Sequence, residues 1–386
     1  MSVAIGLELL LHERRADVAG QRLGLVASPA SVDANLSSSI GRLHGQPGIE
    51  LVSLFGPEHG LRGEAQAGEA VGSYTDARTG LPVHSLYGST RKPTPEMLDG
   101  LDTIIFDLQD GGLRFYTYVS TLAHVMEAAA DTGARVLVLD RPVYLGGIVV
   151  EGGLVEEGYQ SFVGLYPLPI RYGMTAGEIA RLLNEAHGIG CELAVMPMRG
   201  WRREMYFDET GLPFVPPSPN LPTLAAITVY PGTCLIEGTN LSEGRGTTTP
   251  FEYVGAPYVD GHALAEAMNR LELPGVRFRE VFFVPSFGKY RGETCSGVHL
   301  HVTRRDALEP LHTAVYLITT VRRLWPDRFG WRAPWAEGGH YPIDLLSGSS
   351  RLRSCIDAVD DVTDLLVAWK EESRSFAEIR SRYLIY

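Results

Sequence analysis

The chain has 386 residues, more than one hydrophobic core usually spans, so two domains are expected. Its hydrophobic fraction of 45% and charged fraction of 21% are ordinary for a globular protein. The formal net charge of −12 argues against a nucleic-acid partner, because neutralising phosphates requires a basic face. A small anionic substrate is compatible with this charge if arginines are concentrated locally.

The cysteines give no sign of a disulfide framework or a zinc site. Cys191, Cys234, Cys295 and Cys355 lie far apart and form no CxxC pair, so we expect buried free thiols. No segment approaches the apolar length that a bilayer requires, and the N-terminus lacks the charge and cleavage pattern of a signal peptide. We therefore expect a cytoplasmic protein with no membrane partner.

Apolar strand patterns alternate with helical patterns over the first half of the chain. Such alternation predicts βαβ units and an α/β fold with a Rossmann-like, doubly wound, mostly parallel sheet. The expected strands are 22–27, 49–54, 103–108, 135–139 and 192–196.

Two of the intervening helices carry local signals. Thr175 and Glu178 form a predicted capping box at the start of one helix. Residues 118–131 form another, which we expect to end at Gly133.

The pattern changes in the middle of the chain. Residues 213–222 hold five prolines, and residues 233–249 are rich in Gly, Thr, Asn and Glu without periodicity, so we expect long functional loops. Beyond them the predicted elements suggest a smaller α+β domain. The expected domains are a Rossmann-like catalytic domain over 1–255 and a C-terminal domain over 256–386, with helices at 261–271 and 307–325 and strands at 276–284 and 296–302.

Three polar loops follow predicted strands. Since ligands of open α/β sheets bind outside the carboxyl ends of the strands, these loops are expected to line the site. The first contains Phe55-Gly56-Pro57-Glu58-His59-Gly60-Leu61-Arg62-Gly63, the second Asp107, Gln109, Asp110, Arg114, Tyr116 and Tyr118, and the third Asp140-Arg141, which we expect to form an ion pair.

A fourth polar element lies in the middle of the chain. It combines Glu237, Asn240, Glu243 and Arg245 with glycines that allow backbone to approach a ligand closely. Glycoside hydrolysis uses two carboxyl groups, one to protonate the leaving oxygen and one to assist water or attack carbon. Candidates for that pair are Glu58, Asp110 and Glu243.

Other signatures are absent from the sequence. There is no GxGxxG, GxxxxGK[ST], GxSxG or HExxH motif, which weakens a dinucleotide enzyme as an interpretation. His299 and His301 share one face of a predicted strand but have no third ligand at a telling distance. We expect no metal site and no cofactor.

Several long motifs together resemble the bacterial exo-β-N-acetylmuramidase family of the NamZ type. The resemblance runs from about Gly24 to Thr303. It rests on GPEHGLRG, DLQDGGLRFYTY, LDRP followed by GG and VEGG, PSPNLPT, VYPGTCLIEGTNLSEGRGTTTPFE and KYRGETCSGVHLHVT, in this order.

The resemblance implies a hydrolase that removes non-reducing terminal N-acetylmuramic acid from peptidoglycan fragments in cell-wall turnover and recycling. It also implies a Rossmann-like domain, a smaller C-terminal domain and a site between them, without a cofactor. The leading catalytic carboxylate matches Glu58, as general acid. The accompanying polar set corresponds to His59, Arg62, Asp110, Arg114, Tyr116, Asn220, Glu237, Asn240, Glu243 and Arg245.

The substrate implied by the resemblance explains why an acidic protein carries arginines in its motif loops. Muramic acid bears a lactyl carboxylate, which a guanidinium can bind through two hydrogen bonds. We expect Arg62, Arg114 or Arg245 to hold it. The chain departs from the family at Val143-Tyr144, where Asn-Pro often follows the Asp-Arg-Pro motif, so aglycone contacts are expected to differ.

Two alternative functions fit the same residues. A metal-dependent amidase or esterase acting on cell-wall fragments would recruit Glu58, His59, His84 and Asp110 as ligands and base. A non-catalytic muropeptide-binding protein would bind the same fragments without turnover.

Overall fold

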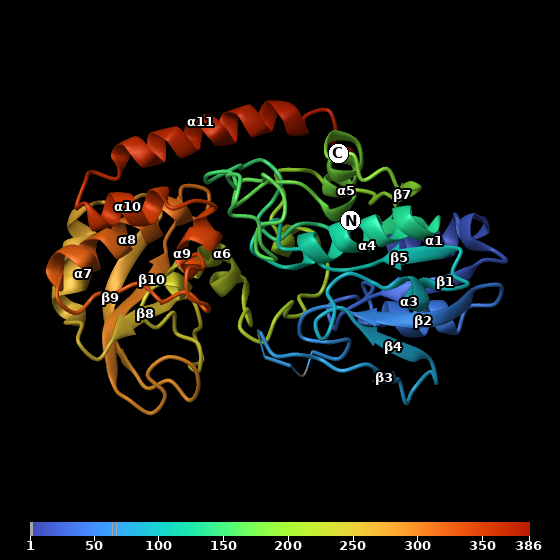
Figure 1. The fold of residues 1–386 in the computed structure, drawn as a ribbon, viewed down its shortest axis with the longest axis horizontal. Coiled ribbons are helices and arrows are strands. Elements are labelled where there is room, and N and C mark those ends of the chain that lie inside the picture. The colour runs from blue at the N-terminus through green and yellow to red at the C-terminus, as the bar shows by residue number, and fades with distance from the viewer. Residues whose placement is uncertain (1–2, 64, 67) are drawn as a thin grey trace. The chain divides into compact units, whose positions relative to one another are not determined.

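The computed structural model describes residues 3–63, 65–66 and 68–386 (Figure 1). Chain contacts divide it into two compact units, each assembled from separated stretches of sequence. The first unit contains Met1–Val149, Tyr172–Pro219 and Ala377–Tyr386. The second contains Val150–Arg171 and Asn220–Phe376.

The first unit is built on a sheet that, in the described part of the chain, has seven strands in the order β3-β4-β2-β1-β5-β6-β7. Neighbours pair in parallel, except that β3 runs antiparallel to β4 at one edge. This confirms the doubly wound, mostly parallel sheet. The strands are β1 (Arg22–Val26), β2 (Glu50–Gly56), β3 (Tyr74–Thr75), β4 (Pro82–Ser85), β5 (Thr103–Phe106), β6 (Arg135–Leu139) and β7 (Leu193–Met196).

The strand order places the polar loops at one edge of this sheet. Without the short β3, the order has the pattern 3-2-1-4-5-6, which is that of the Rossmann fold. The direction of winding reverses at β1, between β2 and β5. Ligands of such sheets bind outside the carboxyl ends of the strands at this reversal. The loops that carry Glu58 and Asp110 follow the two strands that flank β1.

Both faces of the sheet are covered, because successive strand residues are buried on opposite sides. Leu23, Leu25 and Ile105 join one core cluster with residues of α1 (Gly6–His12) and α2 (Ser39–His44). Their strand neighbours are buried as well but lie outside that cluster. The second face is covered by α4 (Tyr118–Thr132) and α5 (Ala176–Ala186), with α3 (Pro95–Leu98) beside α4.

The predicted helix signals are present. The Thr175 hydroxyl oxygen accepts a hydrogen bond from the Glu178 amide, and the Glu178 carboxylate accepts one from the Thr175 amide, so the capping box is confirmed. The helix expected from residue 118 ends at Gly133, whose φ of 80° lets its amide bond back to Ala129.

The second unit has, among its described residues, a three-stranded antiparallel sheet in the order β8-β10-β9 (Figure 1). Its helices α7 and α8 pack against each other, and α7 also contacts β9 and β10. The strands are β8 (Tyr253–Ala256), β9 (Val276–Phe283) and β10 (Cys295–Val302), and the helices are α6 (Leu224–Thr233), α7 (Gly261–Arg270), α8 (Pro310–Leu324), α9 (Pro342–Ser347) and α10 (Arg351–Asp357). The last helix, α11 (Thr363–Arg380), belongs to this unit as far as Phe376. No helix in the described residues is long and apolar enough to cross a membrane.

The middle of the chain is more regular than expected. Residues 224–233 form α6, and a 3-10 turn, Cys234–Gly238, follows it directly. α6 is apolar on all sides and packs against α8, so it lacks the one-sided pattern by which a surface helix is recognised. The expected domain boundary after residue 255 therefore falls inside the second unit, and the division into 1–255 and 256–386 stays a prediction.

Candidate functional site

Glu58 lies just beyond β2 in polar surroundings. Glu58 is 9% exposed, and both of its carboxylate oxygens accept hydrogen bonds. The Gly68 amide donates to Oε1 at 2.9 Å, and the Thr117 hydroxyl donates to Oε2 at 2.7 Å. A buried carboxylate with partners on both oxygens has a fixed orientation. Thr117, which precedes α4, was not among the expected site residues.

Two ring-bearing residues accompany Glu58. His59 has a φ of 73°, a left-handed conformation that is unusual outside glycine, and its Nδ1 lies 3.0 Å from the Ala65 carbonyl oxygen. Burial, together with the nearby Glu58 carboxylate, raises the pKa of Tyr87 to about 12. The Tyr87 phenol therefore stays protonated at neutral pH and serves as a donor beside Glu58.

Asp110 is the second buried carboxylate of this unit. Its Oδ2 accepts hydrogen bonds from the Tyr172 hydroxyl and, at 3.0 Å, from the amide of Gly112, whose φ is 69°. Its Oδ1 is buried without an aligned partner in the described residues. Burial raises the pKa of Asp110 to about 6, although the hydrogen bonds from Tyr172 and Gly112 act in the opposite direction.

Tyr118 connects the surroundings of the two carboxylates. Burial raises the pKa of Tyr118 strongly, and the charges of Glu58 and Asp110 raise it further. Hydrogen bonds with the Tyr116 and Ser28 hydroxyls lower the pKa of Tyr118. Both carboxylates therefore lie within electrostatic reach of one phenol. The Tyr116 hydroxyl donates to the Pro217 carbonyl at 2.7 Å, so its ring is held by the proline-rich segment.

The motif-loop arginines of this unit differ in exposure. Arg62 pairs with Asp76, and its side chain remains 39% exposed. Burial favours the neutral form of Asp76, but hydrogen bonds from Arg62 and Thr79 leave its pKa lowered. Arg114 is only 1% exposed. Among these two guanidinium groups, Arg62 is the more accessible to a ligand.

The side chains of the third motif loop have other partners than the sequence suggested. The expected ion pair between Arg141 and the adjacent Asp140 is not formed. Arg141 instead makes two hydrogen bonds to Asp107, Nε to Oδ1 at 2.7 Å and Nη2 to Oδ2 at 2.9 Å. Asp140 accepts instead from the hydroxyls of Thr175, at 2.7 Å, and Tyr386, at 2.8 Å. Asp140 and Arg141 are adjacent in the chain, but their side chains have different partners. The Arg141 guanidinium, at the end of β6, reaches Asp107, which follows the neighbouring strand β5.

Gln109 belongs to the same structural region. Its side-chain amide donates to the Pro142 carbonyl. It lines a cavity of about 10 Å³ with Arg141 and Tyr144, which is about the size of one water and too small for a sugar. Gln109 therefore supports the loops rather than facing a large cavity there.

The fourth polar element forms a cluster inside the second unit, which we call the carboxylate–cation cluster: Glu237, Glu243, Arg245 and Lys289. Arg245 Nη2 lies 2.8 Å from Glu237 Oε1, and its Nε lies 3.8 Å from Glu243 Oε1. Lys289 Nζ lies 3.0 Å from Glu243 Oε2. Burial, helped by the nearby Glu243 charge and opposed by Arg245, raises the pKa of Glu237. Two carboxylates thus face two cations.

Residues around this cluster hold its backbone. The Arg245 guanidinium lies over the Phe251 ring, 5.3 Å from the centroid, and the Phe251 amide donates to the Glu243 carbonyl at 2.6 Å. Cys234 Sγ lies 3.6 Å from Glu237 Oε1. Burial, followed by the charge of Glu237, raises the pKa of this thiol well above its usual range, so it is a neutral structural thiol.

The two expected asparagines are also in the second unit. Asn240 uses both ends of its amide within the protein, accepting from the Tyr258 hydroxyl and donating to the Arg328 carbonyl, each at 2.8 Å. Asn220 is 5% exposed. Asn240 therefore stabilises the start of the polar loop, and ligand binding by either residue stays a prediction.

His299 and His301 lie side by side, whereas His84 packs against an aromatic ring. His299 and His301 share a sheet face as expected, with ring centroids 3.8 Å apart, and burial lowers the pKa of His299 to about 4 with help from His301 and Arg279. His84 packs against Phe55 at 5.2 Å between centroids. The described ranges contain no group of three or more His, Cys, Asp or Glu side chains able to hold a metal ion.

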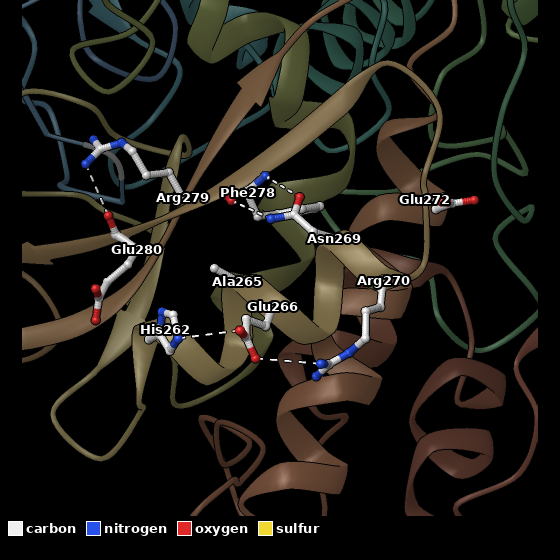
Figure 2. A pocket seen from close by; sticks show the side chains of 9 residues that line it. All are labelled: His262, Ala265, Glu266, Asn269, Arg270, Glu272, Phe278, Arg279 and Glu280. Atoms are coloured by element: carbon white, nitrogen blue, oxygen red, sulfur yellow. Dashed lines mark hydrogen bonds and ion pairs between the residues drawn. The ribbon is translucent and has the colours of Figure 1, made fainter.

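A hollow of about 650 Å³ lies between α7 and β9, away from all the motif loops (Figure 2). Along α7, Arg270 forms an ion pair with Glu266, and His262 Nε2 lies 3.5 Å from the same carboxylate. The Asn269 amide makes two hydrogen bonds, of 2.7 and 3.0 Å, to the backbone of Phe278 and so covers the edge of β9 there. These surface contacts account for the polar lining without a ligand.

Comparison with known sequences covers almost the whole chain. The model of the N-terminal domain of exo-β-N-acetylmuramidase NamZ matches residues 23–225, and the model of its C-terminal domain matches residues 228–386. The chain belongs to the exo-β-N-acetylmuramidase NamZ family. This confirms the resemblance carried by the motifs.

Individual NamZ relatives agree with this assignment. The peptidoglycan β-N-acetylmuramidase NamZ of Bacillus subtilis strain 168 is 47% identical over 384 residues, which cover 100% of this chain and 91% of that protein. Two solved structures of DUF1343 family proteins from Bacteroides fragilis NCTC 9343 are similar over 100% of this chain and 99% of theirs. Their TM-scores are 0.91 and 0.78, at sequence identities of 37% and 29%.

Proposed function

We propose that this protein is an exo-acting glycoside hydrolase that releases N-acetylmuramic acid from the non-reducing end of peptidoglycan fragments. Membership of the NamZ family supports this, as does the B. subtilis peptidoglycan β-N-acetylmuramidase, 47% identical over its match. The structural observation that carries the proposal is the pair of buried carboxylates, Glu58 and Asp110. They follow the strands on either side of β1, and the charges of both raise the pKa of Tyr118.

In this proposal Glu58 is the general acid. The Gly68 amide can only donate, so Oε1 of Glu58 must accept, and the transferable proton resides on Oε2. That proton passes to the glycosidic oxygen as the bond to the anomeric carbon breaks. The Thr117 hydroxyl, 2.7 Å from Oε2, then donates to the carboxylate that remains.

Asp110 is proposed as the partner carboxylate. Whether it activates water or attacks the anomeric carbon, it acts in its ionised form. A pKa of about 6 keeps Asp110 largely ionised at neutral pH while making it more basic than an exposed aspartate. Glu243, the third candidate, belongs to the second unit.

The lactyl carboxylate of muramic acid is proposed to bind Arg62. This guanidinium is 39% exposed, against 21% for Arg245 and 1% for Arg114. Asp76 holds one of its amino groups and so orients the fork toward a second carboxylate. The cytoplasmic location expected from the sequence is part of the proposal, and cell fractionation with an antibody tests it.

The deciding experiment compares two chromogenic substrates, a β-N-acetylmuraminide and the corresponding glucosaminide, with and without a chelator. The proposal expects release of chromophore from the muraminide, much less from the glucosaminide, and no effect of chelation. Cleavage of amide or ester bonds that stops on chelation would support the metal-dependent hydrolase instead. Binding of muropeptides without release of sugar would support a binding protein.

A further inference from the structure

Tyr172 is hydrogen-bonded to Asp110 both directly and through Gly112. Its hydroxyl donates to Oδ2 of Asp110, and the Gly112 amide donates to the same oxygen at 3.0 Å. The Tyr172 amide in turn donates to the Gly112 carbonyl at 3.3 Å. These three hydrogen bonds restrict the rotation of the carboxylate, and Tyr172 takes part in two of them.

The phenol of Tyr172 stays protonated at neutral pH. The side chain is fully buried, and burial, followed by the charge of Asp110, raises the pKa of its hydroxyl well above the usual range. The hydroxyl therefore acts as a donor to the carboxylate. This donation favours ionised Asp110, so it opposes the rise in the pKa of Asp110 that burial causes.

Arg380 binds the main chain of Tyr172. The arginine is 6% exposed, and its Nη1 donates to the Tyr172 carbonyl at 3.0 Å. Nη1 also donates to the carbonyls of Gly147, at 2.9 Å, and Gly173, and Nη2 donates to that of Ile148 at 2.9 Å. One guanidinium thus joins the segment that ends the first stretch of the first unit to the segment that begins its second stretch.

Gly173 shows how closely Arg380 packs against this backbone. The φ of Gly173 is 59°, and a Cβ added there would overlap Arg380 Nη1 and lie 2.6 Å from the Val149 carbonyl oxygen. Any larger residue would displace the guanidinium or the backbone. The position of the Tyr172 main chain therefore depends on Arg380.

Arg380 lies far from the motif loops in the sequence but in the same compact unit as Asp110. It is the last residue of α11, and residues 377–386 belong to the first unit together with Asp110 and Tyr172. All of these contacts therefore lie within one unit. Neither Tyr172 nor Arg380 lies in the sequence motifs that carry the family resemblance.

We propose that Tyr172 and Arg380 are positioning residues for the reaction: Arg380 fixes the main chain of Tyr172, and the Tyr172 hydroxyl orients the Asp110 carboxylate. Neither residue is taken to touch the sugar. The inference rests on the proposed function, since it takes Asp110 to be the carboxylate that assists the reaction. Because the hydroxyl favours ionised Asp110, loss of either contact should raise the pH at which Asp110 ionises.

The other phenols near Asp110 do not titrate near neutral pH. Burial raises the pKa of the Tyr118 and Tyr144 hydroxyls, and the charge of Asp110 raises both further. These two side chains come from α4 and from the loop after β6, and both stay neutral where Asp110 ionises. Glu58, whose charge also acts on Tyr118, is the proposed acid and so determines the alkaline limb of the pH profile.

The test follows kcat/KM for the chromogenic muraminide against pH in Tyr172→Phe, which keeps the ring and removes the hydroxyl. The acid limb, expected at about pH 6 in the wild type, should move to higher pH by about one unit. Tyr144→Phe is the matched control, because that hydroxyl is buried without a hydrogen-bond partner in the described residues, and its limb should stay at about pH 6. A general loss of packing would lower the rate at every pH without moving the limb.

Arg380→Met should move the limb in the same direction, with partial recovery in Arg380→Lys, which keeps the charge but reaches fewer carbonyls. Combined with Tyr172→Phe, either change should add no further shift, because the contact through which Arg380 acts is already lost. Arg380→Lys carries this comparison if Arg380→Met does not fold. Arg382→Met, at an exposed arginine two residues further along, should have the wild-type profile.

The ionisation of Asp110 is also measured without substrate, from the difference in the free energy of unfolding between each protein and its Asp110→Asn version in urea titrations over pH. In Tyr172→Phe the pH dependence of this difference should move upward as well. An unchanged acid limb and an unchanged titration in folded Tyr172→Phe, with circular dichroism as the folding check, would overturn the inference. A wild type that fails to hydrolyse the muraminide would refute the proposed function, while the titration would still test the role of Tyr172.

Discussion

The Thr117 hydroxyl oxygen lies 2.7 Å from Oε2 of Glu58, while the other carboxylate oxygen, Oε1, accepts from the Gly68 amide. Thr117 belongs to the motif loop after β5, whereas Glu58 follows β2. The contact therefore joins two of the three motif loops through the proposed proton donor. A hydroxyl can accept from a neutral acid and donate to a carboxylate, so it suits both protonation states of Glu58.

Thr117→Val is expected to lower kcat for the muraminide on the order of tenfold, because the variant cannot donate to the carboxylate formed by proton transfer. Steady-state kinetics on the chromogenic muraminide measures this. Thr121→Val is the matched control, since that hydroxyl is also buried but donates to the Thr117 carbonyl rather than to a carboxylate. Equal kinetic effects at both positions would remove Thr117 from the reaction.

Glu58→Gln is expected to reduce turnover by about a hundredfold or more while leaving substrate affinity nearly unchanged, because glutamine cannot protonate the leaving oxygen. Calorimetry with an unhydrolysed muropeptide gives the affinity, and chromophore release gives the rate. Glu69→Gln, at an exposed glutamate of the same loop, should have neither effect. A Glu58→Gln enzyme with the wild-type rate would end the assignment of the acid.

Asp110→Asn tests the burial of the second carboxylate through the pH dependence of stability. Burial raises the pKa of Asp110 from 3.8 to about 6, so between these values the folded protein retains a proton that the unfolded chain has lost. The stabilisation is complete below pH 3.8 and is lost as the pH rises through about 6, a difference of about 3 kcal/mol. The free energy of unfolding of Asp110→Asn, relative to the wild type, should therefore increase from pH 4.5 to pH 7.5 in urea titrations, on the order of this amount.

Activity should depend on the same group in the opposite direction. A base or nucleophile must be ionised, so kcat/KM of the wild type should rise as the pH increases through about 6. In Asp110→Asn this limb should disappear together with most of the activity. A limb that persists in the variant would assign it to another group.

Arg62→Ala is expected to raise KM for the muraminide by about tenfold and to leave the glucosaminide reaction unchanged, because only the muraminide carries a lactyl carboxylate. Arg78→Ala, at an exposed arginine two residues beyond Asp76, is the control for a general loss of positive charge. If both substrates weakened equally in Arg62→Ala, the guanidinium would have a structural role with Asp76 instead.

The sequence predicted the elements whose patterns are local. β1, β2, β5, β6 and β7 were expected within two residues at each end, because each is a short apolar run between helices. α5 was recognised because the capping box of Thr175 and Glu178 is written in four consecutive residues. By contrast, α6 was missed, because a helix that is apolar on all sides shows no one-sided apolar stripe.

Side-chain partners were harder to foresee. Arg141 was expected to pair with its neighbour Asp140, yet its partner is Asp107, 34 residues earlier in the chain. The pairing depends on β5 and β6 lying side by side, which no local signal specifies. Tyr172, the partner of Asp110, likewise carries no motif that links it to that carboxylate.

The amino-acid sequence by itself determined the fold class, the family and the chemical nature of the site, since strand periodicity, glycine-rich loops and long motifs are properties of neighbouring residues. Only the tertiary structure decided how those groups are used. In the folded chain, the two oxygens of Glu58 accept from the Thr117 hydroxyl and the Gly68 amide. Burial raises the pKa of Asp110, and Lys289 lies 3.0 Å from Glu243. Burial and hydrogen bonding between distant segments exist only in the folded chain, and they set the protonation and orientation of the groups proposed for catalysis.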